Sequence, residues 1–254
     1  MLIARAALAS GVIFPLYIYP GDNCVNWSSA ISAVAAHPNL PFYWIINPNS
    51  GPGGVNNQPD ANYQACVPKL RPSSNPNVKV IAYVRTGYGT GRSASDVQQD
   101  VHTYAQWGSS YRPSGIFFDE VPYQDSWRTT YKAYADYARS QITNAFVTLN
   151  PGTSAIASGY FSFADQIVTV EKYYKDFSSS DYTISSSTPA SKQAVILHDS
   201  PSTLPTTTIN QIIKTSKIGA VYITDDSQDT DGNPYDSFPS YWSSFLTAVE
   251  TAAK

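Results

Sequence analysis

Charge is scarce in this sequence, and its absence excludes several classes of partner. Lys, Arg, Asp and Glu make up 14% of the 254 residues, and the net charge is −3, whereas an average soluble protein has roughly 25% charged residues. No run of Lys and Arg offers the electrostatic footprint that nucleic acid requires, so we expect no nucleic-acid partner. No apolar run approaches the roughly 20 residues of a membrane-spanning helix, so we also expect no membrane span.

Cysteine and histidine are rare as well. The three histidines and two cysteines form neither a His-x-x-x-His motif nor a paired-Cys motif, which argues against catalytic zinc. Phosphate-binding and dinucleotide-binding fingerprints are missing as well, and we predict no metal and no cofactor. Cys24 and Cys66 follow the first and second predicted strands, which would be neighbours in a barrel. A disulfide is the favoured interpretation, and two buried free thiols are the alternative.

Aromatic residues, in contrast, are abundant. The chain has 19 tyrosines and five tryptophans, and its polar surface is built from Ser, Thr, Asn, Gln and Tyr. Aromatic rings beside uncharged hydrogen-bonding groups suit sugar rings, although core packing is an equally ordinary use for many of them. Asn26-Trp27-Ser28 is a glycosylation acceptor if the chain is secreted.

Short apolar runs of β-branched and aromatic residues recur along the chain, each followed by turn-forming or polar residues. Runs of this length fit strands that are buried on both faces, as in a parallel sheet. The eight predicted strands are Val12–Tyr19, Phe42–Ile46, Val80–Val84, Gly115–Phe118, Ala145–Leu149, Ile167–Val170, Ala194–Leu197 and Ala220–Ile223.

Helical patterns lie between these strands. Apolar residues recur at three- and four-residue spacing in Val25–Ala36, Ala61–Leu70, Ser95–Trp107, Ser126–Thr143, Thr208–Ser216 and Ser237–Ala253. The helix Ala155–Phe163 is short, Asp176–Ser191 is an elaborated loop, and Ser95 is the expected cap of its helix. Alternating strands and helices predict one (β/α)8 barrel over residues 1–254, with an open doubly wound sheet as the alternative. Residues 1–10 are a candidate N-terminal extension or targeting remnant, and we expect a monomer.

The residues after the predicted strands are more polar than those before them. Barrel enzymes build their sites from the loops at the C-terminal ends of the strands, so the acidic residues in those loops are the candidates for chemistry. They are Asp22, Asp119, Glu120, Glu171, Asp199, Asp225 and Asp226.

Asp119, Glu120 and Glu171 are the predicted catalytic residues. Asp119 and Glu120 are consecutive, so their side chains leave the strand in opposite directions, and we expect Asp119 to face the substrate while Glu120 supports the site. Glu171 ends the sixth predicted strand and would face Asp119 across the mouth, as the two carboxyl groups of a glycosidase do. The alternatives are a loop-capping role for Asp119 and Glu120, and an ion pair of Glu171 with Lys172 or Arg85.

Other polar and aromatic residues at the mouth are predicted substrate contacts. They are Tyr17, Asn47, Arg85, Tyr88, Tyr123, Asn150, Tyr173, His198 and Asp225. Asp225 and Asp226 begin an acidic loop that could bind a cation, but the loop lacks the full ligand spacing of a calcium site, and a solvated loop is the alternative.

Four segments of the chain resemble one known family. They are residues 16–21 (LYIYPG), 47–53 (NPNSGPG), 83–90 (YVRTGYGT) and 115–120 (GIFFDE). These segments are similar to the spherulin-4 family, which includes the Sph3-type fungal glycoside hydrolases of family 135. The family often has His where this chain has Arg85, which affects the expected sugar contacts and leaves the acidic residues unchanged.

This resemblance implies a secreted or cell-wall (β/α)8 enzyme that cleaves α-1,4-linked N-acetylgalactosamine within galactosaminogalactan, a fungal wall and biofilm polysaccharide. The family's acidic residues fall on Asp119, Glu120 and Glu171. Two rival functions remain open. One is hydrolysis of another α-galactosaminyl or galactosyl polymer, and the other is a wall or spore-coat protein that binds glycan without cleaving it.

Overall fold

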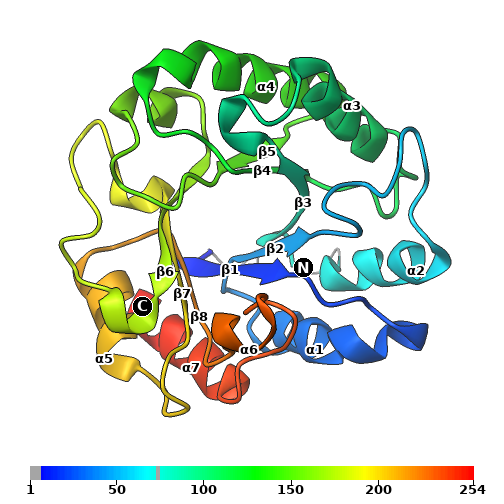
Figure 1. Ribbon diagram of the computed structural model, residues 1–254. Coiled ribbons are helices and arrows are strands. Elements are labelled where there is room, and N and C mark those ends of the chain that lie inside the picture. The colour runs from blue at the N-terminus through cyan, green and yellow to red at the C-terminus, as the bar shows by residue number, and fades with distance from the viewer. Residues whose placement is uncertain (1–6, 73–74) are drawn as a thin grey trace, which may run out of the picture.

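Eight parallel strands close into a barrel in the order β1 to β8 (Figure 1). The structure, a computed structural model, describes residues 7–72 and 75–254. The strands are β1 Gly11–Leu16, β2 Phe42–Ile46, β3 Val78–Arg85, β4 Gly115–Asp119, β5 Phe146–Leu149, β6 Gln166–Tyr173, β7 Gln193–His198 and β8 Ala220–Ile223. The predicted (β/α)8 barrel is confirmed, and the open sheet is excluded because β1 pairs with β8 through Gly11 opposite Ala220.

The strand β6 is longer than its apolar pattern predicted. It continues past Val170 through Glu171 to Tyr173, because its pairing with β7 extends to Tyr173 opposite His198. Polar side chains can occupy this end of the strand since it borders the open mouth of the barrel. Glu171 therefore lies within a strand, where the sheet fixes its backbone.

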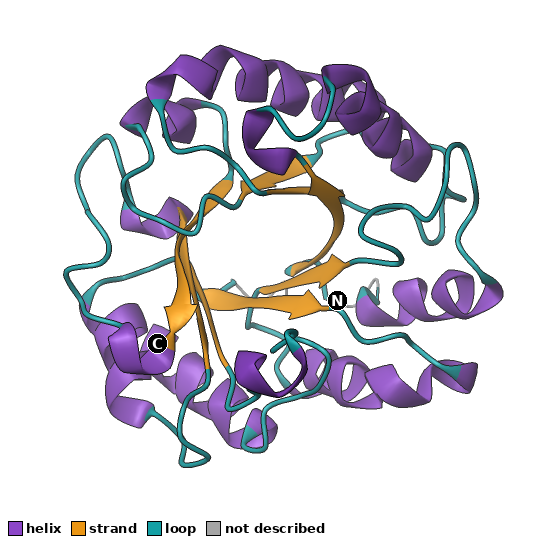
Figure 2. Cartoon of the chain, in the orientation of Figure 1, coloured by secondary structure: helices purple, strands orange, loops and turns teal. Residues whose placement is uncertain are grey.

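Helices surround the barrel (Figure 2). They are α1 Ser28–Ala36, α2 Ala61–Leu70, α3 Ala94–Ala105, α4 Arg128–Gln141, α5 Thr206–Ile209, α6 Gln228–Asp231 and α7 Trp242–Ala253. A π-helix, Asn210–Thr215, continues α5. Between β5 and β6 the described chain forms only the 3-10 turn Ser158–Ser162, in agreement with the short helix expected there.

The prediction that Ser95 caps α3 was wrong. The cap is Ser93, whose Oγ accepts a hydrogen bond from the backbone N–H of Asp96 at 3.2 Å and donates one to the Asp96 carboxylate at 2.7 Å. A serine three residues before an acidic residue can accept a hydrogen bond from an otherwise unpaired backbone N–H at the start of the helix, and the acidic side chain can form a second hydrogen bond that holds the serine in place. Ser95 is inside the first turn and cannot do this.

Aromatic side chains and one disulfide tie the helices to the barrel. Phe14 and Trp44 are fully buried beneath Trp242 of α7, with ring centroids 5.5 and 6.2 Å from the Trp242 ring. A disulfide joins Cys24, which follows β1, to Cys66 of α2.

The N-terminal segment lies partly outside the described residues. The prediction of an extension or targeting remnant concerned residues 1–10, of which 1–6 are not described. Leu8 follows them and donates its backbone N–H to the carbonyl of Asn39 at 3.0 Å, and its side chain packs against the core. In the described part of the chain, no helix combines the length and the apolar character needed to cross a membrane.

Candidate active site

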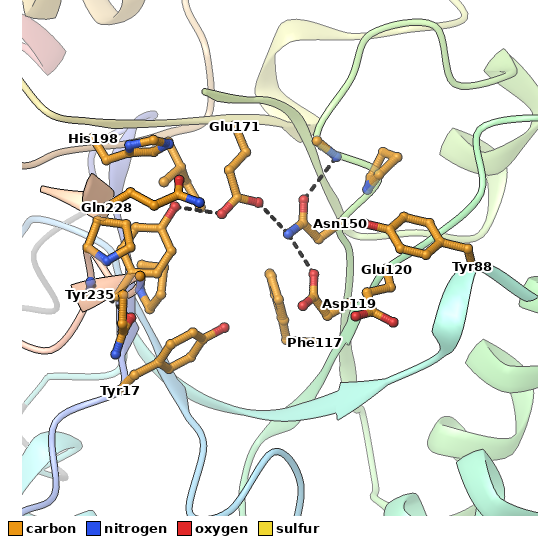
Figure 3. A pocket seen from close by; sticks show the side chains of 17 residues that line it. Tyr17, Tyr88, Phe117, Asp119, Glu120, Asn150, Glu171, His198, Gln228 and Tyr235 are labelled. Atoms are coloured by element: carbon orange, nitrogen blue, oxygen red, sulfur yellow. Dashed lines mark hydrogen bonds between the residues drawn. The ribbon is translucent and has the colours of Figure 1, made fainter. Parts of the chain in front are cut away.

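A cavity of about 530 Å³ opens at the C-terminal ends of the strands (Figure 3). We call it the catalytic cavity. Its wall comes from β1, β4, β6 and β7, from the segment after β5, and from the segment around α6. Its position is the one at which barrel enzymes place their active sites.

The period of the strands explains which side chains reach this cavity. Side chains two residues apart on a strand point to the same face. Phe117 and Asp119 of β4 both line the cavity, and so do Ile196 and His198 of β7. In each pair the apolar residue fills the floor and the polar residue lies above it at the mouth.

Asp119 and Glu171 meet at the centre of the cavity, and we call them the carboxyl pair. The side-chain amide of Asn150 donates to both of them, at 2.8 Å to Asp119 Oδ1 and at 2.6 Å to Glu171 Oε2 (Figure 3). The two oxygens can be no further apart than the sum of these distances, so the two carboxyl groups face one another across a single amide group.

Two tyrosines complete the hydrogen bonding of the carboxyl pair. Tyr83 donates its hydroxyl to Asp119 Oδ2 at 2.7 Å, and Tyr235 donates its hydroxyl to Glu171 Oε1 at 2.6 Å. Every oxygen of the pair therefore accepts one hydrogen bond from a group that stays neutral. These donors orient the carboxyl groups without neutralising them, and each oxygen keeps a second lone pair for a reacting molecule.

Burial and the nearby Glu171 raise the pKa of Asp119 to about 6, although hydrogen bonds from Tyr83 and Asn150 act in the opposite direction. Two carboxyl groups this close cannot both ionise easily, because like charges in a buried site repel each other. The proton belongs to the pair as a whole. Below about pH 6 the pair therefore takes up a proton, and glycoside hydrolysis requires one carboxylic acid beside one carboxylate.

Glu120 lies beside the pair with its backbone in the left-handed region, at φ 55°. Its carboxylate accepts a hydrogen bond from Arg85 Nε at 2.9 Å. The Thr86 hydroxyl lies 2.6 Å from the carbonyl oxygen of Asp119 and 2.9 Å from that of Glu120. The buried hydroxyl of Tyr131 forms a further hydrogen bond with the Thr86 hydroxyl at 2.5 Å. These hydrogen bonds stabilise the strained backbone at Glu120, where the chain turns so that the side chains of Asp119 and Glu120 point in different directions.

His198 forms the opposite wall. Its Nδ1 lies 2.7 Å from Asp199 Oδ2, and its ring contacts that of Tyr173 at 4.5 Å. Burial alone would raise the pKa of Asp199, but hydrogen bonds from His198, Ser227 and the Gln228 backbone lower it below its ordinary value. Asp199 therefore stays charged and holds the His198 ring in place.

The predicted substrate contacts fall into two groups. Tyr17, Tyr88, Asn150 and His198 line the catalytic cavity. The other five lie outside it. Asn47 accepts a hydrogen bond from the Gly51 N–H, Arg85 donates to Glu120, and Tyr123 lines a neighbouring cavity. Tyr173 donates its hydroxyl to Asp229, and Asp225 accepts from the Ser240 N–H.

Sequence reasoning missed Tyr83 and Tyr235. Tyr83 looks like an ordinary core residue of β3, but it precedes Arg85 by two positions, so the alternation of strand side chains could have placed it below the mouth. Tyr235 lies 64 residues from Glu171 along the chain. It comes from the segment after α6, and no local pattern indicates where that segment folds.

The acidic loop after β8 is held by hydrogen bonds. Asp225 accepts from the Ser240 N–H at 2.9 Å, and Asp226 accepts from the Ser227 N–H at 3.0 Å and the Ser237 hydroxyl at 2.6 Å. Among the described side chains, those of residues 7–72, 75–229 and 232–254, no three from His, Cys, Asp or Glu come together as a metal site.

Comparison with known proteins agrees with this architecture. The family model described as spherulation-specific family 4 matches residues 11–249. The chain belongs to this family. The match extends from β1 to α7 and so includes the whole barrel and both members of the carboxyl pair. Comparison with curated proteins gave no match.

Solved structures give relatives of different closeness. Sph3 from Aspergillus clavatus, in complex with GalNAc, is 28% identical with a TM-score of 0.81, over 96% of this chain and 98% of that one. A GH18 chitinase from Pseudoalteromonas aurantia is 13% identical with a TM-score of 0.54, over 96% and 100%. An alpha-amylase from Geobacillus thermoleovorans is 10% identical with a TM-score of 0.54, over 98% and 79%. The last two share the fold alone.

Proposed function

We propose that this protein is a secreted glycoside hydrolase that cleaves within α-1,4-linked N-acetylgalactosamine stretches of galactosaminogalactan with retention of configuration. The observation that carries the proposal is the carboxyl pair bridged by Asn150. Two facing carboxyl groups supported by one amide fit the acid and the nucleophile of a glycoside hydrolase, and their closeness favours the retaining mechanism, which uses a shorter separation than the inverting one.

Asp119 is the nucleophile in this proposal, and Glu171 is the general acid and base. Glu171 donates a proton to the departing glycosidic oxygen while Asp119 attacks the anomeric carbon and forms a glycosyl ester. Glu171 then takes a proton from water, the water oxygen attacks the same carbon, and the Asp119 carboxylate departs. The reaction consumes one water and returns both groups to their starting states. Tyr83 and Asn150 stabilise the Asp119 carboxylate as it departs.

The proposed sugar rests on the GalNAc bound to the Aspergillus relative and on family membership. Sugar chemistry supports an enzyme nucleophile for this substrate. In an α-linked N-acetylgalactosamine the 2-acetamido group lies on the same face as the leaving oxygen. It cannot attack the anomeric carbon from behind, so a protein carboxylate must do so if configuration is retained.

Secretion is part of the proposal. Disulfides persist in oxidising compartments, and Cys24 is joined to Cys66. A polysaccharide substrate also lies outside the cell.

Reducing-end release from galactosaminogalactan tests the proposal, with product masses to identify the sugar. The parent should release N-acetylhexosamine oligomers, and Asp119→Asn and Glu171→Gln should each lower turnover roughly a thousandfold or more, because both groups act in the bond-breaking steps. Release from another galactosyl polymer alone would refute the substrate. Polymer binding by parent and variants without any new reducing ends would identify a glycan-binding wall protein instead.

A further inference from the structure

A second cavity of about 410 Å³ adjoins the catalytic cavity. It is lined by Tyr88, Thr90, Tyr123, Trp127 and Thr153 among others, and we call it the aromatic cavity. Tyr88 and Pro151 line both cavities, so the two share a wall.

The aromatic cavity collects side chains that are otherwise rare on this surface. In the described part of the chain only six large apolar or aromatic side chains are strongly exposed, and two of them lie here, Tyr88 at 62% and Tyr123 at 47%. Core packing does not account for these two rings. Exposed aromatic residues gathered beside a site mark a binding surface.

The loop that carries Tyr88 is held in a costly conformation. Gly87, Tyr88 and Gly89 all have positive φ, at 63°, 52° and 82°, and a bulky residue in the left-handed region is strained. The Tyr88 N–H donates to the carbonyl of Glu120 at 2.8 Å, which fixes the loop to the end of β4. The protein therefore holds an exposed ring at a set position beside its carboxyl groups.

Trp127 supports this loop from below. A side chain at Gly89 would come within 2.7 Å of the Trp127 ring, so the glycine allows the loop backbone to lie against the indole. In Figure 3 the Tyr88 hydroxyl points toward Asn150, and its ring stands at the edge of the catalytic cavity. The Tyr88 side chain thus forms a partition between the two cavities.

We propose that the aromatic cavity is a second sugar subsite, which binds a unit of the same polysaccharide chain beyond the one held at the carboxyl pair. This proposal rests on the proposed function. The apolar faces of a pyranose ring suit the rings of Tyr88, Tyr123 and Trp127, while Thr90 and Gln124 supply polar groups for its hydroxyls. The subsite extends the bound chain toward α4 and favours cleavage within a polymer over release of single sugars.

Calorimetry with α-1,4-linked N-acetylgalactosamine oligomers, from one to six units, tests the subsite. All variants are made in the Asp119→Asn background to prevent turnover. Tyr123→Ala should weaken binding of the hexamer about tenfold, because truncation removes a stacking surface, and should leave binding of the single sugar unchanged. Tyr123→Phe keeps the ring and should bind the hexamer as the background does.

Ile184→Ala is the matched control, because Ile184 is 47% exposed and lines neither cavity. The subsite is refuted if Tyr123→Ala binds the hexamer as tightly as Ile184→Ala does, or if the single sugar is weakened as much as the hexamer. If the background protein binds none of the oligomers, the proposed substrate fails, and the subsite fails with it. Loss confined to Tyr123→Ala and to the longer oligomers supports the subsite.

Discussion

Removing one hydroxyl group beside Asp119 should move the pH dependence of the enzyme. In Tyr83→Phe the ring keeps its place against Tyr17, 5.7 Å away between centroids, and only the 2.7 Å hydrogen bond to Asp119 is lost. That hydrogen bond stabilises the ionised carboxylate and lowers the pKa of Asp119. Its loss should therefore raise the pKa of the carboxyl pair.

The size of the shift follows from the energy of the bond. A hydrogen bond to a charged group contributes about 1.5–3 kcal/mol, and one pKa unit corresponds to about 1.4 kcal/mol. The pair needs one proton for catalysis, so kcat/KM of the parent should fall as the pH rises through about 6. In Tyr83→Phe this fall should occur about one to two pH units higher, with a lower plateau.

Profiles of kcat/KM between pH 3 and 9 measure this shift, together with a carboxyl-carbon NMR titration of Asp119. Tyr104→Phe is the control, because the buried Tyr104 hydroxyl has no hydrogen-bond partner among the described residues. Its profile should match that of the parent. An alkaline limb that stays in place in Tyr83→Phe, or moves to lower pH, would refute the assigned role of Tyr83.

Three further perturbations have defined outcomes. Replacing Cys24 and Cys66 by Ser should lower the free energy of unfolding, measured in urea, by about 4 kcal/mol for a loop closed over 42 residues. Because burial and Glu171 raise the pKa of Asp119 from 3.8 to about 6, the folded state loses stability as pH rises through that window. Asp119→Asn should thus be about 1–3 kcal/mol more stable than the parent at pH 7 in the same assay, and equal stability would contradict the raised pKa. Thr86→Val should lower kcat more than it raises KM, and Thr86→Ser should restore kcat in the same kinetic assay.

Much of the barrel could be predicted because its signal is local. Each buried strand is a short apolar run, and the polar residue that follows it lies at the mouth of the barrel regardless of where the surrounding helices begin and end. Asp119, Asn150 and His198 were found in this way. The boundaries of β6 could not be predicted, since pairing with β7 extends that strand into polar residues.

The donors around the carboxyl pair were harder to predict. Tyr235 reaches Glu171 only because the chain after β8 folds over the mouth of the barrel, and the path of a loop is determined by tertiary contacts that no short pattern contains. Asp225 illustrates the opposite case. It lies near the C-terminal end of a strand as Asp119 does, yet its carboxylate accepts the N–H of Ser240 just before α7 and lies outside the catalytic cavity.

The anomeric form of the first product tests the central claim most directly. Proton NMR during early hydrolysis of an α-1,4-linked N-acetylgalactosamine oligomer should show the α-anomer before the β-anomer, since two displacements at one carbon restore its configuration. Asp119→Asn should lower the rate of product release roughly a thousandfold or more. The β-anomer as first product, or undiminished cleavage by Asp119→Asn, would contradict a covalent mechanism at Asp119 and Glu171.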